Sequence, residues 1–202
     1  DKTLLHDWNL APKDLPVKVF VPFGHKEDYE QKGITFDHTF ALDPAEMHAE
    51  DWILTFGLDI LHPVAILIQR IMNKIEGKRH AIEDLLEELS KDKNAEKQTL
   101  EAATGLFEAA QTWGVFAQKR KEATKVTDLL TAKTTSVLDL SVYNAVGAFN
   151  IRALVISLLS RKIFNERMAA RKKEEVSAIA RGLDYSTTHT KKEIPLAWLF
   201  ID

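Results

Sequence analysis

Cysteine is absent from this chain of 202 residues. Its absence excludes a disulfide framework, a thiolate metal site and a cysteine nucleophile. Such a composition is typical of a protein of the cell interior or of a hot environment. Histidine occurs seven times, but no two histidines stand four residues apart as a helical metal-binding pair would.

Long apolar runs are missing too. No stretch is long enough and free enough of charge to span a bilayer. The chain opens Asp1-Lys2-Thr3, without the apolar core of a secretory signal. The net charge is −3, so the overall balance points to neither nucleic acid nor a membrane, although a local basic patch remains able to bind phosphate. We therefore expect a cytoplasmic protein without membrane contacts.

A phosphate-binding loop is the third absence. The pattern G-x-x-x-x-G-K-[ST] does not occur, and Gly77-Lys78-Arg79 has no glycine at the required upstream spacing. Most phosphate contacts of a P-loop enzyme come from that loop. We therefore assign no catalytic residue, and we expect no tightly bound cofactor on this chain alone.

Three segments rich in β-branched and apolar residues are candidate strands. Residues 17–22 alternate and end at a proline, 40–42 are a short second candidate, and 136–142 return to strand composition. A long helix over 148–180, apolar in its first half and basic in its second, is followed by an apolar run over 195–202. Strand, helix and strand over 136–202 predict a βαβ unit, and hence a parallel sheet.

The rest of the chain is helical by its pattern. Asp43-Pro44 has the N-cap and first-position residues of a helix that we expect to continue to Gly57, and His62-Pro63 opens the next helix. Residues 77–135 are rich in Glu, Lys and Ala, with apolar residues three and four apart, which predicts a helical insertion. The fold class is therefore α/β, a parallel sheet with a large helical insertion and mostly helical content.

The chain ends Pro195-Leu196-Ala197-Trp198-Leu199-Phe200-Ile201-Asp202. A short apolar run after a helix breaker predicts a buried strand, and the carboxyl end of such a strand is where α/β proteins hold ligands. In P-loop NTPases an aspartate at this place holds Mg²⁺. Asp202 is therefore a candidate metal ligand, and the plain alternative is an acidic residue that caps a loop.

A basic stretch runs from Arg161 to Lys173, with six basic residues and one acidic residue. Arg167 and Arg171 are four residues apart and share a helix face. This face could meet the phosphates of DNA or a nucleotide held by a neighbouring subunit. The alternative is a solvated helix end, in which Glu174 and Glu175 pair with the basic residues.

Three segments together resemble the archaeal HerA-type ATPases of the HerA/FtsK branch of P-loop motor proteins. They are Ser136-Val137-Leu138-Asp139-Leu140-Ser141, the long helix with Arg161, Phe164, Asn165, Glu166 and Arg167, and Pro195 to Asp202. The resemblance is good over 136–202, fair over 1–58 and poor over the insertion. It implies that residues 1–202 are a partial RecA-like ATPase domain, the segment between Walker A and Walker B.

This resemblance implies roles for three residues. Asp202 would be the Walker B aspartate that holds Mg²⁺, and Asp139 and Ser141 would lie near the nucleotide at the top of the neighbouring strand. The parent protein would hydrolyse ATP to move duplex DNA through a homo-oligomeric ring, often with a nuclease partner. Walker A and the Walker B glutamate lie outside these residues, so the chain alone would be inactive.

A second hypothesis needs no ATPase. The apolar stripe of residues 77–135 could dock a partner, and the chain would then be a non-catalytic helical interaction module.

Overall fold

The computed structural model describes residues 11, 13–75, 77–117, 122–144, 149–180, 194 and 196–201. Its strands are β1 (Val17–Pro22), β2 (His38–Phe40) and β3 (Thr135–Leu138). Its α-helices are α2 (Lys26–Gln31), α3 (Ala49–Thr55), α4 (Pro63–Ile75), α5 (Ile82–Ser90), α6 (Lys97–Gln111), α7 (Val126–Leu129) and α8 (Phe149–Ala180). Short 3₁₀ turns are η1 (Phe23–His25), η2 (Pro44–Glu46) and η4 (Ser141–Tyr143).

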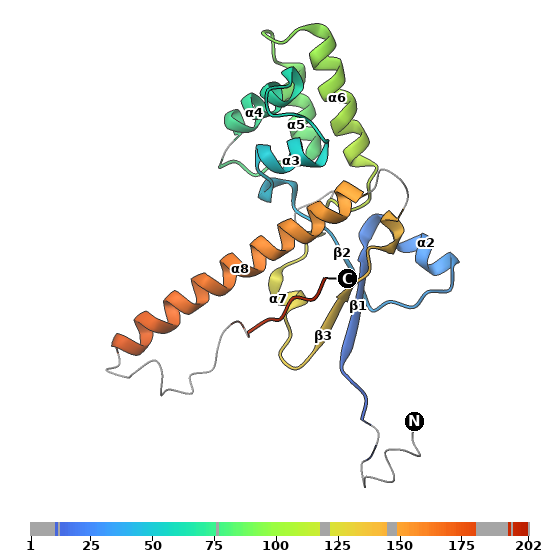
Figure 1. The fold of residues 1–202 in the computed structure, drawn as a ribbon, viewed down its shortest axis with the longest axis vertical. Coiled ribbons are helices and arrows are strands. Elements are labelled where there is room, and N and C mark those ends of the chain that lie inside the picture. The colour runs from blue at the N-terminus through green and yellow to red at the C-terminus, as the bar shows by residue number, and fades with distance from the viewer. Residues whose placement is uncertain are drawn as a thin grey trace.

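The three strands form one parallel sheet in the order β2-β1-β3 (Figure 1). The central strand β1 pairs Phe20 with His38 of β2 and with Leu138 of β3. Because all three strands run the same way, their carboxyl ends meet at one edge of the sheet. The predicted α/β class, with a parallel sheet and mostly helical content, is confirmed.

The predicted strand over 195–202 is wrong for the residues that the structure describes. Residues 196–201 are irregular, and their large apolar side chains are exposed, with Trp198 at 87%. The composition predicted burial, but a strand becomes buried only where a neighbouring strand offers it an edge. Within the described residues the sheet consists of β1, β2 and β3, and residues 196–201 pair with none of them. The parallel pairing therefore comes from β1, β2 and β3, without the expected βαβ unit of 136–202.

Four helices, α3 to α6, form a unit above the sheet that we call the helical lobe (Figure 1). Helix α4 opens at Pro63 as predicted, and it buries one apolar face against α3 and α6. Helices α5 and α6 come from the predicted insertion 77–135, and they pack on each other and on α4. The lobe thus begins at Ala49, well before that segment.

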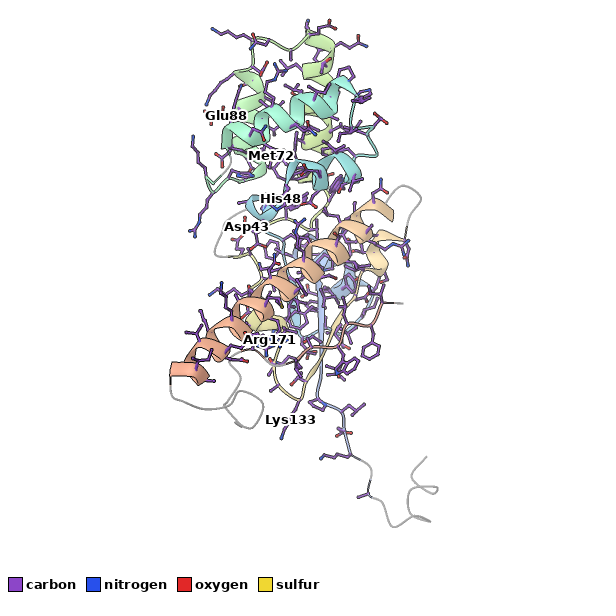
Figure 2. The ribbon with its side chains drawn as sticks, turned by 60° about the vertical axis from the view of Figure 1, so that its left-hand side comes forward. Asp43, His48, Met72, Glu88, Lys133 and Arg171 are labelled. Atoms are coloured by element: carbon purple, nitrogen blue, oxygen red, sulfur yellow. The ribbon has the colours of Figure 1, made fainter. Side chains whose placement is uncertain are left out.

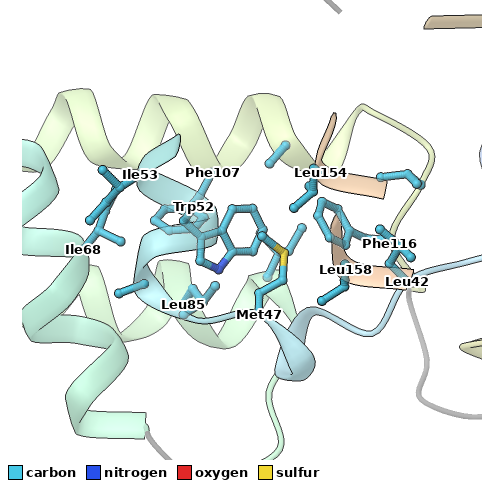
Figure 3. Close-up of a cluster of buried hydrophobic side chains, with 14 of the residues drawn as sticks. Leu42, Met47, Trp52, Ile53, Ile68, Leu85, Phe107, Phe116, Leu154 and Leu158 are labelled. Carbon is cyan, nitrogen blue, oxygen red and sulfur yellow. The ribbon is translucent and has the colours of Figure 1, made fainter. Parts of the chain in front are cut away.

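Trp52 lies at the centre of a core that joins the lobe to the sheet layer (Figure 3). Its ring is fully buried and lies 5.0 Å from the ring of Phe107 and 5.2 Å from that of Phe116, measured between ring centroids. The same cluster continues to Phe20 of β1 and Leu158 of α8. One apolar core therefore spans both parts of the molecule.

The predicted helix from Asp43 to Gly57 is split in two. The Asp43 carboxylate accepts from the backbone N of Ala45 at 3.0 Å, as an N-cap does, but only one 3₁₀ turn, η2, follows. A second start lies at His48, whose backbone N donates to the Asp51 carboxylate at 2.8 Å. Asp43 and Asp51 each satisfy the backbone at a separate helix start, so the segment forms the turn η2 and the helix α3 in place of one helix.

Helix α8 confirms the predicted long helix and crosses the molecule from the lobe outward (Figure 1). Its first half is buried on one side, through Ile151, Leu154, Val155, Leu158 and Leu159. The apolar composition of the first half predicts burial, which holds on this side only, because Phe164 is 64% exposed. No helix within the described residues is long and apolar enough to cross a membrane.

An ion-paired junction fastens α8 to the start of the lobe. The Arg161 guanidinium donates to both carboxylate oxygens of Asp51, at 2.9 and 2.7 Å, and to the carbonyl of Glu46. Next to it, Lys162 donates to the Glu46 carboxylate at 2.7 Å. Burial alone would raise the pKa of Asp51, but hydrogen bonds from Arg161 and His48 outweigh it, so the pKa lies below the ordinary 3.8.

This junction predicts an acid-dependent loss of stability. Because the folded pKa of Asp51 lies below its unfolded value, the stabilisation is full above about pH 4 and is lost as the pH falls through the lowered pKa. We expect Asp51→Asn to lower the free energy of unfolding at pH 7 by about 1.5–3 kcal/mol. Urea titrations from pH 7 to pH 2.5 should show the two proteins converging at low pH.

The matched control is Glu101→Gln, which removes an exposed pair with Lys97 on α6. We expect it to change the free energy of unfolding by less than about 0.5 kcal/mol at every pH. A constant gap between Asp51→Asn and the unchanged protein down to pH 2.5 would contradict the assignment of the junction to the ionised carboxylate.

Candidate functional site at the carboxyl edge of the sheet

Asp139 follows β3 at the carboxyl edge and stays tied to β1. Its backbone N donates to the carbonyl of Phe20 at 2.9 Å, which extends the pairing one residue past the strand. Its carboxylate Oδ1 accepts from the backbone N of Ser141 at 2.8 Å and closes a tight turn. Asp139 and Ser141, which the sequence places together, are therefore neighbours in space.

Tyr29 of α2 joins these two residues from across the sheet edge. Its hydroxyl lies 3.4 Å from both the carbonyl of Asp139 and the hydroxyl of Ser141. Burial, with a smaller contribution from the Asp139 carboxylate, raises the pKa of Tyr29 above its ordinary value. The phenol thus stays protonated and can donate at neutral pH.

His25, at the end of the turn η1, makes a second set of contacts next to those of Tyr29. Its Nδ1 lies 2.8 Å from the Asp28 carboxylate, and its Nε2 lies 3.0 Å from the carbonyl of Trp113. The hydroxyl of Tyr143 donates to the same carbonyl at 2.8 Å, and burial raises the pKa of Tyr143. The loop after α6 is thereby fixed to the carboxyl ends of β1 and β3.

Two glycines let these loops touch. The backbone N of Gly24 donates to the carbonyl of Gly114 at 2.8 Å. A Cβ on Gly24 would overlap the Cα of Gly114, and one on Gly114 would lie 3.0 Å from the ring of His25. The loops approach closely because neither position carries a side chain.

Sequence reasoning missed His25, Tyr29 and Tyr143 as parts of this edge. The one available signal was Gly24-His25-Lys26 directly after a predicted strand, since a glycine there permits close approach of a ligand or backbone. The partner of that glycine, Gly114, is far away in the sequence, and no local pattern pairs the two.

Around Ser141, this edge offers the Asp139 carboxylate and neutral hydroxyls from Ser141 and Tyr29. The hydroxyls can donate to phosphate oxygens, and the carboxylate can accept from the water shell of Mg²⁺. Within the described residues no three carboxylate or histidine groups converge as a metal site. The candidate metal ligand Asp202 lies outside the described residues.

Arg167 and Arg171 lie on the outer half of α8 (Figure 2 labels Arg171). Arg167 makes two bonds to the Glu174 carboxylate, at 3.0 and 3.1 Å, and both side chains are largely buried. Arg171 pairs with Glu175 at 2.9 Å in an exposed position. Both arginines thus have acidic partners on their own helix, but only the pair of Arg171 and Glu175 is solvated as the alternative expects.

No family model, no curated protein and no solved structure matches this chain.

Proposed function

We propose that this chain is the segment between Walker A and Walker B of a HerA-like ATPase that moves duplex DNA. The observation that carries the proposal is the position of Asp139 and Ser141, at the carboxyl edge of a parallel sheet and directly before the long helix α8. In open α/β sheets this edge is where ligands bind. The resemblance of 136–202 to that family supplies the identity of the ligand, ATP with Mg²⁺.

The residues at the edge fit an outer contact to the nucleotide. Asp139 can accept hydrogen bonds from Mg²⁺-bound water, and the neutral hydroxyls of Ser141 and Tyr29 can donate to phosphate oxygens. Direct coordination of Mg²⁺ would come from Asp202, and the phosphate cradle from a Walker A loop that these residues lack. We propose a cytoplasmic parent protein that forms a homo-oligomeric ring, often with a nuclease partner.

The basic half of α8 fits this proposal only in part. Arg171 is exposed and paired with an exposed Glu175, so DNA phosphate could displace that partner. Arg167 is largely buried and held by the largely buried Glu174, so DNA phosphate could reach it only by breaking that pair. Of the two, Arg171 is therefore the better phosphate contact.

We expect the isolated chain to show no micromolar affinity for ATP in calorimetry, because the phosphate cradle is missing.

In the full-length protein, Asp139→Asn should lower the ATP hydrolysis rate about tenfold or more, since it removes a charge next to the proposed nucleotide. The steady-state rate at saturating ATP is the measurement.

Asp128→Asn is the matched control, because Asp128 caps the short helix α7 away from this edge. It should leave the hydrolysis rate within about twofold. Micromolar ATP binding by the isolated chain, or full activity of a folded Asp139→Asn protein, would contradict the proposal.

The alternative is a non-catalytic interaction module. It is favoured by one observation, the large apolar side chains that the structure leaves exposed on the lobe and on α8. A full-length protein that binds no nucleotide but captures a defined protein partner through the lobe would support this alternative over the ATPase.

A further inference from the structure

The chain has two exposed apolar surfaces whose neighbouring charges have opposite sign. The first, which we call the lobe patch, consists of residues of α3, of the loop that follows and of α4, and it has two acidic neighbours, Glu50 and Asp59. Its apolar residues, Leu54, Ile60, Leu61 and Ile66, are between 50% and 79% exposed. Glu50 precedes Leu54 by one helical turn, so the two side chains share a face of α3.

The second surface, which we call the outer stripe, lies on the half of α8 that extends away from the lobe (Figures 1 and 2). Its apolar residues, Phe164, Met168, Val176 and Ile179, are between 49% and 77% exposed. Their spacing places them on one face of the helix, with Lys172 in the middle. Outside this stripe, the same half of the helix has buried residues, Ala170 and Ala178. The outer stripe is therefore apolar with a positive charge, where the lobe patch is apolar with negative charges.

The two surfaces of one chain cannot meet. The side chain of Asn150, at the start of α8, donates to the carbonyl of Thr55 at 3.0 Å, next to the lobe patch. At about 1.5 Å per residue, Phe164 lies about 21 Å along the helix from that point, and Ile179 about 44 Å. Side chains in contact need about 4–4.5 Å between their atoms.

We infer that the lobe patch of one chain binds the outer stripe of a second copy of the same chain. Apolar area would be buried on both sides, and Glu50 or Asp59 would face Lys172. Such a contact joins two different surfaces, so it leaves one patch and one stripe free at the two ends of each pair. Further copies can then add until the assembly closes on itself. The contact supplies surfaces for the homo-oligomeric ring of the proposed function and rests on that proposal. It is tested without nucleotide or DNA, so its failure is distinguishable from a failure of the ATPase proposal.

Sedimentation of the full chain, without nucleotide or DNA, tests this contact over a micromolar to submillimolar concentration series. We expect reversible self-association. The double substitutions Leu54→Ser with Leu61→Ser, and Phe164→Ser with Ile179→Ser, should each raise the dissociation constant at least tenfold. All four side chains are exposed, so the variants should stay folded, as far-UV circular dichroism would show.

A charge exchange makes the test specific. E50K and K172E should each weaken self-association severalfold, and a mixture of the two should associate more strongly than either alone, because lysine on one patch then faces glutamate on the other stripe. K173E is the control, since Lys173 carries the same charge but lies on another face of α8.

Two results would overturn the inference. One is association that survives both double substitutions. The other is a chain that stays monomeric over the whole series, and binding of its outer stripe to anionic phospholipid vesicles would then identify the stripe as a lipid-binding surface.

Discussion

Replacing Gly24 with alanine is expected to destabilise the protein by about 2–4 kcal/mol, from overlap with a neighbouring backbone and the loss of one hydrogen bond. The added Cβ would meet the Cα of Gly114 and lie 3.0 Å from its carbonyl oxygen. These are main-chain atoms, so no side-chain rotation relieves the overlap. The loop after α6 would have to move away, and the bond from Gly24 N to Gly114 O would break. Urea unfolding at neutral pH measures the loss.

Gly105→Ala is the matched control in α6. A Cβ at Gly105 would find no atom within 4 Å. In a helix interior, alanine is favoured over glycine, so this variant should gain up to about 1 kcal/mol. A Gly24→Ala protein as stable as the unchanged chain would show that the two loops do not touch in solution.

The second large effect is expected at Trp52. Trp52→Ala removes a fully buried indole that contacts the rings of Phe56, Phe107 and Phe116. Truncation of a buried aromatic side chain to alanine costs about 3–5 kcal/mol, because both burial and packing are lost. This is a large share of the 5–15 kcal/mol that stabilises a typical domain, so we expect a partly unfolded protein at 37 °C. Thermal unfolding followed by circular dichroism is the measurement.

Trp198→Ala is the control for a tryptophan of the same chain, because Trp198 is almost fully exposed. Its free energy of unfolding should stay within about 0.5 kcal/mol of the unchanged value. If Trp52→Ala proved as mild as this control, Trp52 would not be the centre of the core.

Sequence periodicity and helix-end signals predicted those helices and strands that such local signals determine. The strand at 17–22, the helix opening at Pro63 and the long helix α8 each carry the periodicity and end signals of their element. Residues 196–201 have equally strong strand composition but stay irregular. A strand depends on pairing with a neighbouring strand, and no residue within the segment encodes that partner.

Some residues of the candidate site could likewise be predicted from the sequence, and others could not. Asp139 and Ser141 could be proposed from their place after a strand. Tyr29 could not, because its contact with Ser141 depends on how α2 returns across the edge of the sheet. The pairs that Arg161 makes with Asp51, and His25 with Trp113, join residues about 90–110 positions apart, and only the folded chain brings them together.

The single core around Trp52 also bears on how this molecule folds and how it can be altered. A lobe with its own core could be deleted or exchanged as a module, and it would melt independently of the sheet. Here Phe107 of the lobe, Phe20 of β1 and Leu158 of α8 belong to one apolar cluster. Cutting out the lobe would expose the apolar sides of the elements that it covers. The chain should therefore gain and lose its structure in one cooperative step, with the lobe and the sheet as a single folding unit.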